Sequence, residues 1–247
     1  MSQIRYLAVG DSALTVDFGN EISESVSARV QALQQRLERE KWAGVIETLP
    51  TFRSVLIYYD PLRISFGELC EKLKNLPDLN ESSLRTSRRI FEIPVCYGAR
   101  FGLDLHDAEK LTGLTADEII ALHSGRDYRI YMLGFLPGFP YLGGMDERLQ
   151  MPRLQNPRTR IPAGSVGIGG TQTGIYPMDS PGGWRLIGMT PIRLYDPNRE
   201  KPILYEAGDY IRFVPISIDD YYDIHRLAEA GAYECRVIEE TEGGSRS

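Results

Sequence analysis

The sequence has 247 residues, of which 42% are apolar and 25% are charged, an ordinary balance for one large globular domain or two small ones. A formal net charge of −6 removes the electrostatic attraction to phosphate that supplies most non-specific affinity for nucleic acid, so neither DNA nor RNA is an expected partner. No stretch reaches the roughly 18 uninterrupted apolar residues of a membrane span, and the N-terminus has no apolar signal sequence, so we expect a cytoplasmic protein with no membrane partner.

Residues 1–80 alternate short strands with amphipathic helices. Strands are predicted at 6–9, 13–18, 44–49 and 54–59. A helix is predicted from about Ser23 to Lys41, because its apolar residues recur at three- and four-residue intervals, and a second helix begins at the capping box of Ser65 and Glu68. This order of elements predicts a small N-terminal α/β domain of ferredoxin-like type.

Residues 78–89 are polar and lack an apolar period, so we place the domain linker there. Beyond it, short helices are predicted at about 103–111 and 116–123, and strands at 91–95, 128–133, 185–188, 192–195, 203–205 and 210–214. Between Gly134 and Pro191 lie twelve of the 24 glycines and eight of the 15 prolines, residues that break helices and favour short strands and turns. This pattern predicts a closed or nearly closed β-barrel over residues 90–217.

The last segment, residues 218–247, is predicted to hold a tyrosine-rich helix at about 218–230 and a frayed polar tail from Glu239 onward.

The two short helices on either side of Gly113 also allow a helix-turn-helix interpretation. Since Asp117 and Glu118 in the first turn of the second helix would repel phosphates, a structural role is favoured for them. The whole chain is expected to be an α+β protein.

The sequence lacks the motifs of a self-sufficient catalyst: it has no P-loop, no H-E-x-x-H and no G-x-S-x-G. Ser165 follows Ala-Gly, where a nucleophile elbow needs Gly in place of Ala, so it is expected to be a turn serine. Cys70, Cys96 and Cys235 are too few and too scattered for disulfides or a metal clamp. The three histidines lack ligand spacing, so no metal is expected. His123, near a predicted helix end, would be stabilised there as a cation, or would serve helix termination or packing.

The glycine- and proline-rich block carries the remaining candidates. Its loop 134–144 holds four large apolar side chains, Phe139 among them, and such a loop is either pinned against the core or lines a pocket. Arg153, Arg158 and Arg160 follow, and planar guanidinium groups on a rigid backbone can clamp a carboxylate or a phosphate. Solvated surface arginines are the alternative interpretation.

Neutral hydrogen-bonding side chains then stand among glycines that permit close approach of the backbone. They are Thr171, Gln172, Thr173, Tyr176 and Ser180. A wall of this kind suits a small amide or carboxylate ligand, although the same side chains can also stabilise turns through bonds to their own backbone. Residues 167–172 fall short of a dinucleotide-binding G-x-G-x-x-G because Gln172 occupies its last glycine position.

Several segments of this block resemble a known family. They are residues 131–144 (YMLGFLPGFPYLGG), Pro152-Arg153 with Pro157-Arg158, residues 161–168 (IPAGSVGI), 172–177 (QTGIYP) and 180–184 (SPGGW). On these motifs the chain is identified as a member of the KipI/PxpB family, that of the 5-oxoprolinase B subunits. The family is also labelled allophanate hydrolase subunit 1, and it is similar to subdomains C and D of the carboxyltransferase domain of urea carboxylase. The resemblance covers residues 4–217.

The resemblance implies a fold and an activity. The fold is a small N-terminal α/β domain followed by a cyclophilin-like β-barrel. The activity is that of a non-autonomous component of 5-oxoprolinase, which opens 5-oxo-L-proline to L-glutamate with ATP hydrolysis, together with PxpA-type and PxpC-type partners. ATP would bind at a shared site or on a partner. The resemblance assigns no nucleophile or base to this chain.

A substrate-binding site is expected in the glycine- and proline-rich block. Arg153 or Arg158 would hold a carboxylate or a phosphate, while Gln172 and the backbone amides of Gly169 and Gly170 would contact the amide group. The same site is expected to be lined by Phe139, Tyr176 and Ser180.

An alternative function is that of a KipI-type inhibitor, which binds a sensor histidine kinase and blocks its autophosphorylation. A third interpretation is a carboxyltransferase-like subunit that acts on another amide or on urea.

Overall fold

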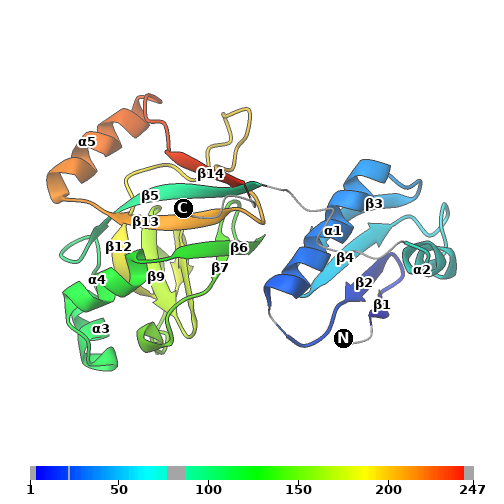
Figure 1. Cartoon of the computed structure of the whole chain (residues 1–247), viewed down its shortest axis with the longest axis horizontal. Coiled ribbons are helices and arrows are strands. Elements are labelled where there is room, and N and C mark those ends of the chain that lie inside the picture. The colour runs from blue at the N-terminus through cyan, green and yellow to red at the C-terminus, as the bar shows by residue number, and fades with distance from the viewer. Residues whose placement is uncertain (1–3, 22, 77–86, 242–247) are drawn as a thin grey trace. The chain divides into compact units, whose positions relative to one another are not determined.

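The structure of the protein, a computed structural model, describes residues 4–21, 23–76 and 87–241. The chain divides into two compact units, Met1–Arg85 and Thr86–Ser247, each built around a β-sheet (Figure 1). Each unit has a hydrophobic core of its own. Over the ranges given above, no helix combines the length and the apolar character needed to cross a membrane.

The N-terminal unit holds a four-stranded antiparallel sheet in the order β1-β2-β4-β3. Its strands are β1 (Arg5–Val9), β2 (Ala13–Asp17), β3 (Val45–Pro50) and β4 (Ser54–Tyr59). The element order, ββαββα, differs from the βαββαβ order of a ferredoxin-like domain because one edge strand comes first instead of last. The ferredoxin-like assignment therefore stays a prediction.

Two helices, α1 (Glu24–Glu40) and α2 (Phe66–Lys74), pack against this sheet. The Ser23 hydroxyl accepts the Val26 N–H at the start of α1, and the predicted capping box of Ser65 and Glu68 is formed at the start of α2. The two helices and the two central strands share one core. It includes Val30 and Leu33 of α1, Leu69 and Leu73 of α2, Leu14 of β2 and Ile57 of β4.

The C-terminal unit holds an eight-stranded sheet in the order β10-β9-β12-β5-β13-β6-β7, with β14 also paired to β5. Its strands are β5 (Ser87–Tyr97), β6 (Asp127–Leu133), β7 (Pro140–Gly143), β9 (Ser165–Gly169), β10 (Gln172–Ile175), β12 (Arg185–Met189), β13 (Tyr210–Pro215) and β14 (Val237–Thr241). Because β10 at one end of this order lies beside β7 at the other, the sheet curls into a nearly closed barrel (Figure 1). The barrel predicted from the glycine- and proline-rich block is thus confirmed.

Short helices and a two-stranded ribbon complete this unit. They are α3 (Leu105–Thr112), α4 (Ala116–Ser124), the 3-10 helix η2 (Glu147–Leu149), α5 (Ile218–Glu229), and the ribbon of β8 (Arg158–Ile161) and β11 (Ser180–Gly182). The capping box of Thr115 and Glu118 starts α4, as predicted. Ala108 of α3 and Ile119 of α4 are fully buried in the barrel core, so both helices are packing elements. This favours the structural role over helix-turn-helix recognition.

Four local predictions are wrong. Residues 192–195 and 203–205 are not strands but share a single bridge between Tyr195 and Ile203, beside Pro202, which has no N–H to donate to a ladder. Residues 87–89, assigned to the linker, begin β5. The tail expected to fray from Glu239 instead forms β14 as far as Thr241. The remaining parts of the predicted linker and tail, residues 78–86 and 242–247, lie outside the described residues.

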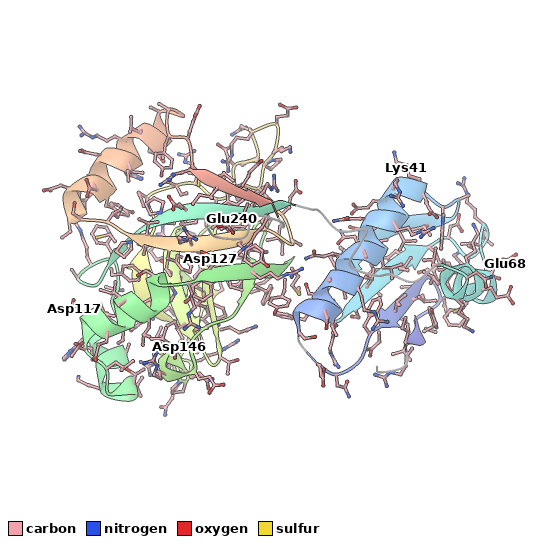
Figure 2. All side chains as sticks on the ribbon, viewed as in Figure 1. Lys41, Glu68, Asp117, Asp127, Asp146 and Glu240 are labelled. Atoms are coloured by element: carbon pink, nitrogen blue, oxygen red, sulfur yellow. The ribbon has the colours of Figure 1, made fainter. Side chains whose placement is uncertain are left out.

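Paired charges explain why so polar a segment as β14 forms a strand. Arg88 of β5 donates to Asp127 of β6 at 2.7 Å and lies 3.5 Å from Glu240 of β14. Figure 2 labels the two acidic residues, Asp127 and Glu240. Arg236 just before β14 lies 3.1 Å from Glu92 of β5. Opposite charges on neighbouring strands contribute roughly 0.2–1 kcal/mol each, and such pairing over long sequence distances has no local sequence signal.

Candidate functional site

Three aromatic rings gather where the glycine- and proline-rich block closes the barrel. The Trp184 ring lies 5.5 Å from Phe139 and 6.2 Å from Tyr176, centroid to centroid, and both pairs meet edge to face. Phe139 and Tyr176 meet in the same way at 5.4 Å. Edge-to-face pairs of this kind contribute about 0.5–1.5 kcal/mol each beyond the burial of their area. We call Phe139, Tyr176 and Trp184, with the buried Ile161 and Leu186 beside them, the Trp184 cluster.

Glycines make room for these rings. A Cβ atom at Gly169 would lie 2.3 Å from Cδ1 of Trp184, and one at Gly174 would lie 3.1 Å from Cζ3 of the same ring. A Cβ atom at Gly182 would lie 2.6 Å from the Tyr176 hydroxyl oxygen. The packing of Trp184 and Tyr176 therefore explains why these three positions are occupied by glycine. The predicted contact between Gly169 and a ligand stays a prediction.

The three predicted arginines differ in their partners. Arg158 donates to both carboxylate oxygens of buried Asp104, at 2.9 and 2.7 Å, and exposed Arg160 pairs with Asp179 at 2.6 Å. The guanidinium carbon of Arg153 lies 5.8 Å from the Trp184 ring centroid, a cation–π contact. Within the described part of the chain, no carboxylate forms an ion pair with Arg153. This exposed cation at the edge of the Trp184 cluster is free to hold an anion.

The other predicted residues occupy three different places. Tyr176 belongs to the cluster, and burial raises the pKa of its phenol, so the hydroxyl stays protonated near neutral pH. Gly170 lies at the turn between β9 and β10 with φ of +67°, and its N–H already donates to the Met151 carbonyl at 2.8 Å. Half-buried Gln172 begins β10 just after that turn. Ser180 is buried in the ribbon, and its hydroxyl has no hydrogen-bond partner among the residues described.

Sequence reasoning missed one strained aromatic residue in the loop 134–139. Phe135 has φ of +66°, and the N–H of Leu136 donates to the carbonyl of Gly134 at 2.8 Å, which closes a γ-turn around it. Left-handed backbone at a bulky residue costs about 1–3 kcal/mol and is concentrated at functional sites. The side chain of Phe135 is 63% exposed and its ring meets Phe139 edge to face at 5.6 Å. The Trp184 cluster thus extends to the surface through Phe135.

A buried polar network inside the barrel was also missed. His123 contacts the Tyr97 hydroxyl through Nδ1 at 2.8 Å and the Thr173 hydroxyl through Nε2 at 2.7 Å. Thr173 donates its one proton to the carbonyl of Gly167 at 3.1 Å, so it accepts from the Nε2–H, and Tyr97 donates to Nδ1. Burial lowers the pKa of His123 to about 3, so the ring is neutral. The predicted stabilisation of His123 as a cation is wrong, and its packing role is confirmed by the ring of Phe213 stacked 4.4 Å away.

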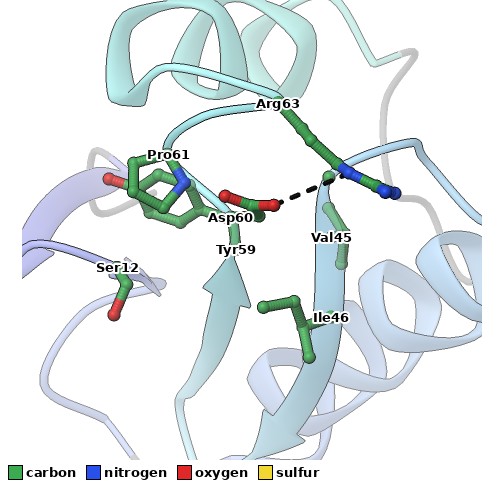
Figure 3. Close-up of a pocket in the computed structure, with 8 residues that line it drawn as sticks. Ser12, Val45, Ile46, Tyr59, Asp60, Pro61 and Arg63 are labelled. Carbon is green, nitrogen blue, oxygen red and sulfur yellow. Dashed lines mark ion pairs between the residues drawn. The ribbon is translucent and has the colours of Figure 1, made fainter.

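The N-terminal unit has a cavity of about 300 Å³ that contains none of the predicted site residues (Figure 3). Val45 and Ile46 of β3 form one wall, and Asp60 and Arg63, 3.6 Å apart, form another. Across both units, the described side chains of His, Cys, Asp and Glu form no group of three that could hold a metal ion. The Trp184 cluster with Arg153 is therefore the arrangement that best matches the predicted ligand chemistry.

Comparison with known proteins agrees in both sequence and fold. The chain matches the family described as carboxyltransferase domain, subdomain C and D, over residues 4–205. It is 44% identical over 225 residues to the B subunit of 5-oxoprolinase from Bacillus subtilis (strain 168), a match that covers 87% of this chain and 93% of that protein. It is 39% identical over 216 residues to the B subunit of 5-oxoprolinase from Escherichia coli O157:H7, covering 87% and 97%.

Solved structures extend the comparison to longer proteins. The crystal structure of TTHA0988 is 39% identical with a TM-score of 0.74, and the match covers 87% of this chain but only 40% of that one. The K. lactis urea amidolyase has a TM-score of 0.77 at 23% identity, and this chain corresponds to 16% of its length. The second likeness shows a shared fold, and both show that the same fold occurs as one portion of larger chains.

Proposed function

The chain belongs to the KipI/PxpB family, the family of the carboxyltransferase domain, subdomain C and D, and from this membership we propose that it is the B subunit of an ATP-dependent 5-oxoprolinase. The observation that carries the proposal is the 44% identity with a 5-oxoprolinase B subunit over 93% of that protein's length. Similarity over a whole chain, rather than over one motif, favours a shared role in the assembled enzyme. The finer assignments, a cyclophilin-like barrel and a ferredoxin-like N-terminal domain, belong to the same proposal.

The reaction is the opening of the cyclic amide 5-oxo-L-proline to L-glutamate with hydrolysis of ATP. A lactam is stabilised by resonance, and phosphorylation of its amide oxygen by ATP would make the carbonyl carbon open to attack. The enzyme must therefore hold the ring and its carboxylate in a fixed position while charge develops on the amide oxygen. We place the ATP at a site shared with, or carried by, a partner protein.

The chemistry of the described side chains supports a subunit that does not act alone. An activated cysteine nucleophile needs a lowered pKa, but burial raises the pKa of Cys70 and Cys96 and raises that of Cys235 to about 12. His123 is neutral and enclosed, with both ring nitrogens engaged by Tyr97 and Thr173. We therefore assign to this chain the binding and positioning of the substrate.

Arg153 is the residue that we assign to the substrate carboxylate. It is exposed, it lies over the Trp184 ring, and it has no ion-pair partner within the described ranges. Arg158 is held by Asp104 and supports the ribbon beside the site, and the buried hydroxyl of Ser180 in that ribbon has no hydrogen-bond partner among the described residues. The assignment of Gln172 and Gly169 to the amide group stays part of the proposal, whereas the N–H of Gly170 would first have to leave the Met151 carbonyl.

Partners of the PxpA and PxpC types complete the proposed enzyme. The exposed ring of Phe135, strained in its γ-turn and continuous with the Trp184 cluster, suits a contact that a partner protein covers. Co-expression with both tagged partners tests this directly: a complex that contains all three chains is expected to co-purify. Failure to associate with either partner, together with inhibition of a sensor histidine kinase in an autophosphorylation assay, would replace the proposal by the kinase-inhibitor alternative.

A further inference from the structure

A second cavity, of about 200 Å³, lies in the C-terminal unit, and none of the Trp184 cluster lines it. One wall is the turn-containing segment 192–204 and the other is the end of α5 with the chain that follows it. A water molecule occupies about 30 Å³ of liquid, so the cavity has the volume of about six or seven waters, enough for a small organic molecule. Its apolar walls include Ile192, Leu204 and Tyr233.

The cavity contains a cation whose hydrogen bonding is incomplete. Arg199 is tied to the segment by Nη2, which donates to the carbonyls of Arg193 at 3.1 Å and Pro202 at 3.2 Å. Its Nε is enclosed by the protein and has no hydrogen-bond partner among the residues that the structure describes, so a ligand in the cavity would be held by Nη1, to which no described residue gives an acceptor. No described carboxylate forms an ion pair with Arg199. By contrast, Arg193, which also lines the cavity, is held by Glu229 at 2.8 Å.

An anion without a cationic partner lines the same cavity. Oδ1 of Asp196 accepts the backbone N–H of Asn198 at 2.9 Å and its side-chain amide at 3.2 Å, which fixes the turn. Within the described ranges no Lys, Arg or His forms an ion pair with Asp196, not even Arg199 three residues further on. The cavity is therefore lined by one positive and one negative group that form no ion pair with each other, together with apolar side chains.

We propose that this cavity binds a small free α-amino acid, with its carboxylate on Arg199, its ammonium group on Asp196 and its side chain against Ile192, Leu204 and Tyr233. A zwitterion matches two separated opposite charges, whereas a simple anion or cation satisfies only one of them. The site is independent of the proposed oxoprolinase role, because it shares no residue with the Trp184 cluster.

Titration calorimetry on the full chain tests the proposal, with L-alanine and L-leucine as probes and propionate and ethylamine as analogues that carry only one of the two charges. We expect heat from the amino acids and weaker binding of both propionate and ethylamine, since each analogue meets only one of the two charges. The chain after α5, which includes Tyr233 and Cys235, reports the location. Amide hydrogen exchange in the peptide that contains these two residues should slow when L-leucine is bound. Absence of binding by both amino acids, or unchanged exchange in that peptide, overturns the proposal.

Variants separate the two charges. Arg199→Met should weaken amino-acid binding about tenfold or more, since a charge-assisted hydrogen bond is lost. Because Arg199 also ties two carbonyls of the segment, Asp196→Asn is the second test: asparagine retains the acceptor for the turn, so amino-acid binding should weaken while propionate binding stays unchanged. Arg160→Met, which removes an exposed arginine paired elsewhere, is the control and should bind as the wild type does. Equal amino-acid affinity in wild type and both cavity variants contradicts the proposal.

Discussion

Arg158 and Asp104 are joined by two parallel hydrogen bonds, of 2.9 and 2.7 Å, although 54 positions separate them in the sequence. Asp104 also accepts the backbone N–H of Leu186 at 2.6 Å. The carboxylate thus ties the start of α3 to the ribbon strand β8 and to β12. Trp184 directly precedes β12. The buried carboxylate of Asp104 therefore holds in place the strands that position the Trp184 cluster.

Asp104→Ala is expected to destabilise the protein by about 2–3 kcal/mol. Removing one partner of a buried pair costs about 3–5 kcal/mol, and the 27% exposure of the Arg158 side chain reduces that value because water can reach the remaining charge. Chemical denaturation followed by the fluorescence of Trp184, in a Trp42→Phe background, gives the measurement. Arg160→Met breaks an exposed pair and should change the free energy of unfolding by less than about 1 kcal/mol. Equal losses in the two variants would show that the Asp104 pair has no special role.

His123 should make the stability of the protein depend on pH between about 6.5 and 3. Burial lowers its pKa to about 3, so below the ordinary value of 6.5 the unfolded chain binds a proton that the folded chain does not. The contribution of neutral His123 to the free energy of unfolding is therefore fully present above pH 6.5. As the pH falls below 6.5, the free energy of unfolding decreases by about 1.4 kcal/mol per pH unit until the pKa of the folded state, about 3, is reached.

Urea denaturation of wild type and His123→Gln at pH 7, 6, 5 and 4.5 checks this dependence. The difference in free energy of unfolding between the two proteins should shrink as the pH falls, because glutamine does not titrate. His106→Gln alters a histidine whose side chain is 78% exposed, so it should run parallel to wild type. A difference between wild type and His123→Gln that stays constant across this range would rule out a neutral, enclosed His123.

Arg153→Met should impair the assembled enzyme without unfolding this chain. Loss of a charge-assisted bond to the substrate carboxylate is expected to lower kcat/KM for 5-oxoproline about tenfold or more, mainly through KM, because the carboxylate is held equally in ground and transition states. Steady-state kinetics at varied 5-oxoproline measures this, with Arg160→Met as the matched exposed arginine. Wild-type KM in Arg153→Met would remove Arg153 from the site.

Phe135→Asn should weaken association with the partner proteins while leaving the isolated chain folded. Asparagine tolerates the left-handed backbone at this position, so the stability should stay within about 1 kcal/mol of wild type. Loss of an exposed aromatic anchor should lower the affinity of the complex about tenfold or more, as measured by biolayer interferometry. Leu103→Asn removes a side chain that is 59% exposed and lies outside the cluster, and it should bind as wild type does. Equal effects of both substitutions would argue against a contact at Phe135.

Local signals in the sequence predicted much of the fold. The capping boxes at Ser65 and Thr115 set the starts of α2 and α4, and the density of glycine and proline predicted the barrel. The features that were predicted wrongly or missed depend on contacts between residues far apart in the sequence. The strand β14 is polar and is held by partners such as Arg88, about 150 positions away. The neutral state of His123 depends on Tyr97 and Thr173, which come from other elements.

The candidate site, like the fold, could be predicted only in part from the sequence. Sequence reasoning selected Phe139, Tyr176 and Arg153, and the structure brings all three around Trp184. It could not distinguish Arg153 from Arg158, because the partner that engages Arg158 lies 54 positions earlier in the sequence. Nor could it foresee that Gly169 makes room for an indole ring, since this explanation requires the packing of Trp184 against β9.

The most direct test is the formation of L-glutamate and the hydrolysis of ATP, measured together with 5-oxoproline, by PxpA-type and PxpC-type partners with and without this chain. The account predicts that both products form in step only when all three proteins are present, and that this chain alone forms neither. Glutamate formation by the isolated chain, or equal rates from the partners in its absence, would contradict the proposal that the chain is a required, non-autonomous subunit.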